Sequence, residues 1–210
     1  MFNFSTNTLI NKTFKMSDLD KQIEASKECK EDEKIIESVT LKNIISPKTL
    51  NSNVDKEIKE IYIFEIIVKE RYIPEIFIRE LDKNIKLMTL FLIRHEDYEC
   101  GVIAYKKDKF KDKYYATNWE NRTDYDIPLG SSVSGCYKFI LSKFLEYLPF
   151  EKESVDMYYK RNNQLKKLDF QIDKTQKAIR YETQSKKRFE YNDRLKEYIE
   201  ERKSLLEEGK

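Results

Sequence analysis

The segment from Val155 to Lys210 constrains the fold most, because it contains no Pro and its only Gly is Gly209. Its apolar residues recur at heptad-like steps and are separated almost entirely by charged and amide side chains; they are Leu165, Leu168, Ile172, Ile179, Tyr191, Leu195, Tyr198 and Leu205. So narrow an apolar stripe is typical of a coiled coil and cannot enclose a core by itself. We therefore expect this segment to be helical and to pair with another helix.

Two arrangements of this segment fit the sequence. The polar run from Glu182 to Lys187 interrupts the apolar stripe, which resumes near Phe189 on a shifted register. A helical hairpin explains the interruption, and so does one continuous helix with a stutter that pairs with a second copy. We favour the hairpin. In either arrangement the stripe is the predicted partner-binding surface, through Leu165, Leu168, Ile172, Leu195 and Tyr198.

Length and charge limit the remaining possibilities. A chain of 210 residues has room for one domain of about 150 residues and an appendage, so we expect a body over 1–150 and a helical arm over 151–210. The chain has 40 basic and 38 acidic side chains, and its net charge of +2 creates no global field that would attract nucleic acid or an anionic membrane. Any such binding must come from local patches.

The cysteines and the hydropathy pattern predict a cytoplasmic protein. Cys29, Cys100 and Cys136 are far apart and odd in number, which argues against a disulfide scaffold and fits a reducing compartment. The first ten residues lack the basic start and apolar run of a signal peptide, and no window approaches the apolar length of a membrane span. We expect neither export nor membrane insertion.

The pattern of residues before the arm predicts an α+β fold with a small mixed β-sheet packed with helices, followed by a C-terminal helical hairpin or coiled coil. Apolar residues that include Ile35, Ile36 and Val39 suggest two helices between 17 and 39. Both alternating faces of 58–68 are apolar, which indicates a strand covered on both sides. Further expected elements are a helical turn over 47–51, helices over 74–84 and 133–148, and strands over 87–94, 100–105 and 114–119.

Few residues offer recognisable catalytic chemistry. His95 is the single histidine, and it has no Ser or Cys nucleophile that the sequence places beside it. The four glycines form neither a phosphate-binding loop nor a dinucleotide fingerprint. A metal site would require His95 and Cys100 together with carboxylates from elsewhere. We predict no cofactor and no metal.

One alternative is a Mg²⁺-dependent nuclease. Such enzymes hold the metal with paired carboxylates on a strand edge and use a nearby lysine to stabilise developing phosphorane charge. Asp55 and Glu57 precede the strand expected over 58–68, and Glu65 and Lys69 lie along it. Because 37% of the residues are charged, such spacings arise by chance, so we rank this hypothesis second.

A lysine-rich segment between two expected strands is the candidate nucleic-acid contact. Lysines neutralise phosphates and aromatic rings stack on bases, although such a segment is often only a solvated turn. The candidate residues are Lys106, Lys107, Lys109, Lys111, Lys113 and Tyr115.

Several short motifs resemble an uncharacterised bacterial family known as a domain of unknown function. They are Leu81-Asp82-Lys83, Leu90-Phe91-Leu92, Ala104-Tyr105-Lys106 and Tyr115-Ala116-Thr117-Asn118-Trp119, together with the turn at 47–51 and the segment 188–206. The resemblance covers nearly the whole chain, and Asn118 stands where the family has an acidic residue. It implies no activity. It implies a genomic context, because proteins of this family tend to be encoded beside helicases and DNA methyltransferases of restriction-like, phage-defence systems.

The leading hypothesis is therefore a non-catalytic accessory subunit that binds a larger helicase or methyltransferase through its helical arm and sheet body, with weak DNA contact as an additional possibility. A homodimeric scaffold protein is the third hypothesis, because the apolar stripe would equally pair with a second copy.

Overall fold

The computed structural model describes residues 2–19, 21, 26–106, 113–121, 125–127 and 131–207. The chain divides into two compact units, Met1–Phe144 and Leu145–Lys210. Each unit is described by itself below.

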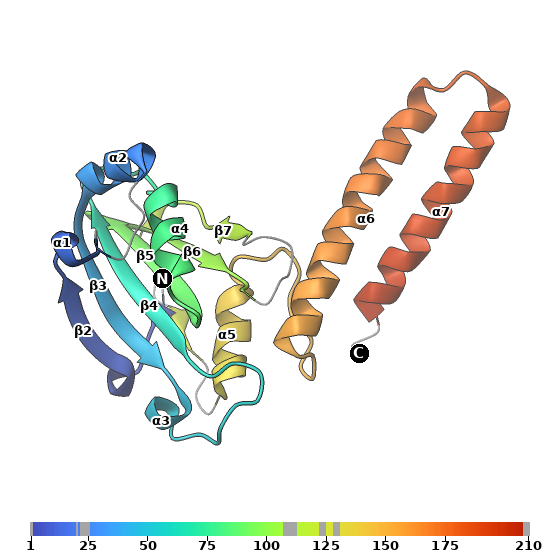
Figure 1. The fold of residues 1–210 in the computed structure, drawn as a ribbon. Coiled ribbons are helices and arrows are strands. Elements are labelled where there is room, and N and C mark those ends of the chain that lie inside the picture. The colour runs from blue at the N-terminus through green and yellow to red at the C-terminus, as the bar shows by residue number, and fades with distance from the viewer. Residues whose placement is uncertain are drawn as a thin grey trace. The chain divides into compact units, whose positions relative to one another are not determined.

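The first unit is built on a mixed sheet (Figure 1). The parallel pair at its centre, β4 and β5, is joined through a helix, and the other pairings are antiparallel. The strand order is β2 (Leu9–Phe14), β3 (Ile36–Ile45), β4 (Ile61–Val68), β5 (Met88–His95), β6 (Tyr98–Ala104) and β7 (Tyr114–Ala116), with β8 (Glu120–Asn121) also paired to β6. Two short strands, β1 (Phe2–Asn3) and β9 (Tyr125–Asp126), form a separate parallel pair. The predicted α+β class with a mixed sheet is confirmed.

One face of this sheet packs against α2 (Lys27–Ile35) and α4 (Glu75–Lys83). Successive residues of a strand point to opposite faces, so alternate residues of β4 and β5 share this core with the apolar side of α4. The buried residues include Phe64, Ile66, Phe91, Ile93, Phe77, Ile78 and Leu81. Asp32 on α2 fixes the start of α4, because its Oδ2 accepts hydrogen bonds from the backbone N–H groups of Ile76 and Phe77.

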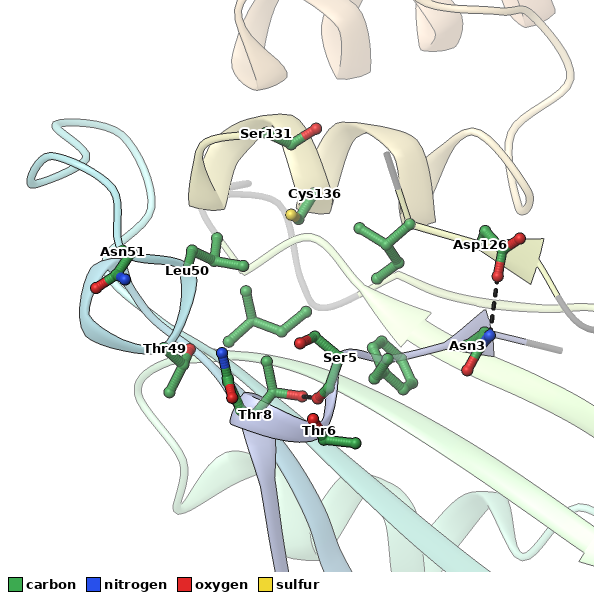
Figure 2. Close-up of a pocket in the computed structure, with 14 residues that line it drawn as sticks. Asn3, Ser5, Thr6, Thr8, Thr49, Leu50, Asn51, Asp126, Ser131 and Cys136 are labelled. Carbon is green, nitrogen blue, oxygen red and sulfur yellow. Dashed lines mark hydrogen bonds between the residues drawn. The ribbon is translucent and has the colours of Figure 1, made fainter. Parts of the chain in front are cut away.

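The other face of the sheet is also buried over much of its length. Ile61, Ile63 and Leu90 are fully buried there, as the apolar run over 58–68 predicted. Helix α5 (Val133–Leu141) lies on this side (Figure 2), and Tyr137 Oη donates a hydrogen bond of 2.9 Å to the carbonyl oxygen of Ala104 on β6. The remaining helices are short: α1 (Met16–Leu19), α3 (Pro47–Leu50) and the 3₁₀ turn η1 (Thr6–Thr8).

Two predictions about elements were wrong. Ile36 and Val39 lie on strand β3, because α2 ends at Ile35 and the chain continues directly into a ten-residue strand. The polar residues of 36–45 hide this strand, which is stabilised by pairing with β2 on one side and β4 on the other. The helix expected over 133–148 ends at Leu141 and is followed by turns.

The second unit contains two long helices, α6 (Val155–Tyr181) and α7 (Ser185–Glu207). They lie side by side in Figure 1, and the connection between them is three residues long, so they form an antiparallel hairpin. Ser154 begins α6 by accepting a hydrogen bond of 3.1 Å from the N–H of Met157. The favoured hairpin arrangement of the arm is therefore observed. Neither helix, nor any other in the described part of the chain, is apolar enough over a sufficient length to span a membrane.

Candidate functional site

A network of four charged side chains crosses β3, β4, β5 and β6 on the face of the sheet opposite α4. Lys42 Nζ lies 2.9 Å from Glu65 Oε1, and Arg94 Nε lies 2.6 Å from Glu99 Oε2. The same guanidinium donates from Nη1 to Glu65, which joins the two pairs. Two cations therefore face two carboxylates, and the network has no net charge. Glu65 and Glu99 are both buried, and a buried carboxylate is stable only beside a cation, so Lys42 and Arg94 are needed to hold these two charges inside the fold.

The network occupies Glu65, one of the carboxylates considered as a magnesium ligand. Both of its oxygens already accept hydrogen bonds from cationic groups. A metal ion would have to displace Lys42 or Arg94, and either displaced cation would lose its buried partner, Glu65. The arrangement of Glu65 therefore fits a structural charge cluster better than a metal site.

Asp55 also serves the fold. Its carboxylate accepts hydrogen bonds from the backbone N–H groups of Glu57 and Ile58, and from both the N–H and the hydroxyl of Ser134 at the start of α5. Burial alone would raise the pKa of Asp55, but these hydrogen bonds outweigh burial and lower the pKa to about 2. Asp55 thus joins the loop before β4 to α5.

The remaining members of the nuclease hypothesis are engaged separately. The backbone of Glu57 donates to Asp55, whereas Lys69 Nζ donates a hydrogen bond of 2.7 Å to the carbonyl oxygen of Lys34 at the end of α2. Asp55, Glu65 and Lys69 each have different partners, and the structure does not gather them around one point. Among the described residues, no three His, Cys, Asp or Glu side chains form a group that would hold a metal ion.

The possible nucleophiles and the single histidine are also parts of the fold. Cys29, Cys100 and Cys136 are buried free thiols. Burial raises the pKa of Cys29 and Cys136 to about 11 and that of Cys100 to about 12, so the reactive thiolate is scarce at neutral pH. His95 Nδ1 lies 3.0 Å from the carbonyl oxygen of Val68 and connects the ends of β5 and β4.

The first unit contains a cavity of about 600 Å³ (Figure 2). Its lining is mostly uncharged and combines hydroxyl and amide groups with a few apolar side chains; it includes Asn3, Ser5, Thr6, Thr8, Thr49, Leu50, Asn51, Asp126, Ser131 and Cys136. Asp126 is held by Asn3, whose Nδ2 donates a hydrogen bond of 2.9 Å. No Lys or Arg is present among the described lining residues, so this cavity offers no cation for a phosphate group.

The lysine-rich segment is described only in part. Lys107, Lys109 and Lys111 lie outside the described residues. Lys106 Nζ forms an ion pair of 2.6 Å with Asp82 Oδ1 and donates to the carbonyl oxygen of Ile85, so it anchors β6 to the end of α4. Tyr115 is buried, and Lys113 Nζ lies 5.1 Å from the centre of its ring. Of this group, Lys113 is the described residue with an exposed side chain.

The five predicted partner-binding residues lie along the hairpin. Leu165 and Leu168 on α6 are buried, whereas Ile172 on α6 and both Leu195 and Tyr198 on α7 are half-buried. The spacing of these residues places them where α6 and α7 face each other. The structure thus brings the apolar stripe together within one chain.

A charged contact fastens the two helices beside this stripe. Arg202 Nε on α7 lies 2.6 Å from Asp169 Oδ1 on α6, and Tyr147 donates from its hydroxyl to the other oxygen of Asp169. Burial tends to raise the pKa of Asp169, but the hydrogen bonds from Tyr147 and Arg202 hold it below its usual value. Arg202 thus holds α7 against α6 through Asp169. The pattern of apolar residues in the sequence could not have identified it.

A shallow groove of about 500 Å³ runs along the hairpin between α6 and α7. Its apolar floor includes Ile199, which is 46% exposed. Its full lining is Asp169, Ile172, Gln176, Ile199, Arg202, Lys203 and Leu206. Helix α7 has 23 residues, and none of them is buried. The side chains of α7 are therefore at most half-buried in the described part of the chain.

The fold and these sites define an α+β domain followed by a helical hairpin. The chain belongs to the family described as a domain of unknown function (DUF4391), whose model matches residues 2–201. This match confirms the resemblance to a domain-of-unknown-function family over nearly the whole chain. No curated protein and no solved structure is significantly similar to it.

Proposed function

We propose that this protein is a non-catalytic accessory subunit that binds a larger DNA-processing enzyme through its helical hairpin, with the sheet body as a second docking surface. The observation that carries the proposal is the open groove between α6 and α7. Helix α7 is 23 residues long and none of them is buried, so its apolar side chains keep surface that a partner would cover. A partner helix seated in the groove would complete a three-helix bundle.

The lining of the groove fits an amphipathic helix. Ile172, Ile199 and Leu206 supply apolar contacts along its floor, and Asp169, Arg202 and Lys203 supply charges at its sides. This combination is typical of grooves that accept a helix with apolar residues at three- and four-residue steps. Of the predicted partner-binding residues, Ile172, Leu195 and Tyr198 retain exposed surface for such a partner, whereas Leu165 and Leu168 are already buried.

The engaged side chains of the first unit favour the same proposal. Asp55, Glu65 and Lys69 have structural partners, and the buried thiols are protonated at neutral pH. The proposed partner class is a helicase or DNA methyltransferase of a restriction-like, phage-defence system, which is the context that the family resemblance implies. In that setting the chemistry belongs to the partner.

The test is affinity purification of the tagged chain from its native host, with nuclease treatment, followed by mass spectrometry. We expect a stoichiometric helicase or methyltransferase to co-purify. A variant with Ile199→Glu and Leu206→Glu should lose this partner, because two carboxylates in the groove cannot be buried against an apolar helix. Retention of the partner by this variant would remove the groove from the proposal.

A matched control uses the same chemistry outside the groove. Leu148 and Met157 are 73% and 62% exposed in the same unit, so Leu148→Glu with Met157→Glu should leave partner recovery unchanged. Circular dichroism of both variants must show the native helix content. If the native chain is recovered alone with a doubled mass in light scattering, the groove pairs two copies and the homodimeric scaffold is the better proposal.

A further inference from the structure

The turn between α6 and α7 concentrates positive charge. Residues 174–188 contain six basic side chains and one acidic side chain, a net charge of +5 in a chain whose total is +2. The basic residues are Lys174, Lys177, Arg180, Lys186, Lys187 and Arg188, and all six are exposed. Lys177 pairs with Asp173, whereas none of the other five forms an ion pair with another described residue. The rest of the chain is therefore net negative, and this end of the hairpin is a local basic patch.

The positive potential comes from side chains. The two helices are antiparallel, so the negative end of the α6 dipole and the positive end of the α7 dipole meet at the turn and largely cancel. Five unpaired cations in one small region repel one another, and this repulsion costs stability unless an anionic partner relieves it. A solvated helix surface with no such partner ordinarily mixes both signs of charge.

Aromatic rings are exposed in the same region. Four aromatic side chains of the described residues are exposed, and three of them are on this hairpin: Phe170 at 68%, Tyr181 at 85% and Phe189 at 67%. An exposed ring forgoes the stabilisation that burial would give. Their occurrence beside the unpaired cations is a second feature that the fold of the hairpin does not require.

Spacing aligns the two features on α6. Phe170, Lys174, Lys177 and Tyr181 follow one another at steps of four, three and four residues, so they form one stripe along the helix. At roughly 100° per residue, this stripe lies on the opposite side of α6 from Leu165, Leu168 and Ile172, which are buried or half-buried. It extends for about 16 Å at 1.5 Å per residue. The stripe ends at the turn, where the basic residues of α7 begin.

We infer that this basic and aromatic surface of the hairpin binds single-stranded nucleic acid. Lysine and arginine side chains neutralise successive phosphates, and exposed rings stack on unpaired bases, which a duplex would keep covered. The surface is separate from the groove that includes Ile199, so it does not require the proposed partner enzyme. An anionic membrane would use the cations but would not need rings at this spacing.

The test measures fluorescence anisotropy of the full purified chain with labelled single-stranded DNA and RNA oligonucleotides. We expect salt-dependent binding to single strands that is at least about tenfold tighter than binding to a duplex of equal length. Replacement of Lys174, Arg180 and Lys187 by Gln should weaken single-strand binding at least about tenfold. It should also reduce the slope of log K against log salt by about 2, since each phosphate contact contributes about 0.7.

Two controls separate this surface from general charge. Lys160, Arg194 and Lys196 are exposed cations on the same hairpin, outside both this surface and the groove, and their replacement by Gln changes the net charge equally. This control should bind as the native chain does. Tyr181→Ala should weaken binding at least about fivefold, whereas Tyr181→Phe keeps the ring and should leave binding unchanged.

Three outcomes would overturn the inference. They are equal losses in the two triple-Gln variants, duplex binding as tight as single-strand binding, and binding to phosphatidylserine vesicles without binding to either oligonucleotide. Each is independent of co-purification of the partner enzyme, so failure of this inference and failure of the accessory role are distinguishable.

Discussion

Arg94 on β5 lies directly opposite Glu99 on β6, with 2.6 Å between Arg94 Nε and Glu99 Oε2. Because the same guanidinium also binds Glu65, replacement of Arg94 by Met would leave two buried carboxylates with one remaining cation, Lys42. Breaking a buried ion pair from one side costs about 3–5 kcal/mol. We expect Arg94→Met to lower the free energy of unfolding by about 3 kcal/mol, measured by urea denaturation.

Arg79→Met is the matched control for this loss. Arg79 forms an exposed ion pair with Glu75 one helical turn away on α4, and such pairs contribute little. Arg79→Met should therefore lower the urea midpoint of unfolding much less than Arg94→Met does. If Arg94→Met were as stable as the native chain, the network would not be a structural cluster, and Glu65 would again be available for metal binding.

The contact between Arg202 and Asp169 should couple the two helices of the hairpin. Both side chains are about a third exposed, so solvent screens the pair and we expect a coupling energy of about 1 kcal/mol from a double-mutant cycle with Arg202→Ala and Asp169→Ala. The coupling should fall in high salt. Lys177 and Asp173 are more exposed and lie within α6, so their cycle should give a smaller value. Equal coupling in both cycles would contradict a special role for Arg202.

The buried cysteines should be unreactive in the folded protein. Their raised pKa values, about 11 for Cys29 and Cys136 and about 12 for Cys100, leave almost no thiolate near neutral pH, and burial blocks access as well. We expect iodoacetamide to label none of the three under native conditions and all three in guanidinium chloride, as measured by mass spectrometry. Rapid native labelling of Cys136 alone would contradict the burial of its thiol at the edge of the pocket that it lines.

The strongest local patterns predicted the elements best. Strands β4 and β5 have apolar residues on both faces, and the hairpin of β5 and β6 has a polar turn between apolar arms, so the expected strands over 58–68, 87–94 and 100–105 match the sheet closely. The interruption at 182–187 likewise indicated the turn between α6 and α7. In each case residues close in sequence determine the structure.

Strand β3 and the charge network depend on residues that are distant in sequence. Thr40 and Asn43 are buried polar residues, and their hydrogen bonds to Thr13 on β2 and Thr8 on η1 exist only when that segment lies alongside. Lys42, Glu65, Arg94 and Glu99 belong to four different strands, so their meeting requires the strand order and register. Asp55 and Glu65 looked alike as candidate ligands in the sequence, and only their partners show that both serve the fold.

The hydrogen bonds to Asp55 should make stability depend on pH. Its pKa is lowered from 3.8 to about 2 in the folded chain, so the folded state favours the ionised carboxylate. This contribution to stability is fully present when the pH is above 3.8, the pKa of the carboxyl in the unfolded chain. It is lost as the pH falls through about 2, the pKa in the folded chain. The difference in pKa corresponds to at most about 2.5 kcal/mol.

An Asp55→Asn variant tests this dependence, since it keeps the shape of the side chain but cannot ionise. Urea denaturation should show the native chain more stable than the variant by about 2 kcal/mol at neutral pH, and this difference should shrink steadily below about pH 4. Asp97→Asn is the control, because Asp97 lies exposed in the turn between β5 and β6 and its replacement should give a difference near zero. If the stability difference between Asp55→Asn and the native chain stayed constant from neutral pH to about pH 2, the charge of the carboxylate would not be its cause. The lost stability would then come from changed packing around Ser134.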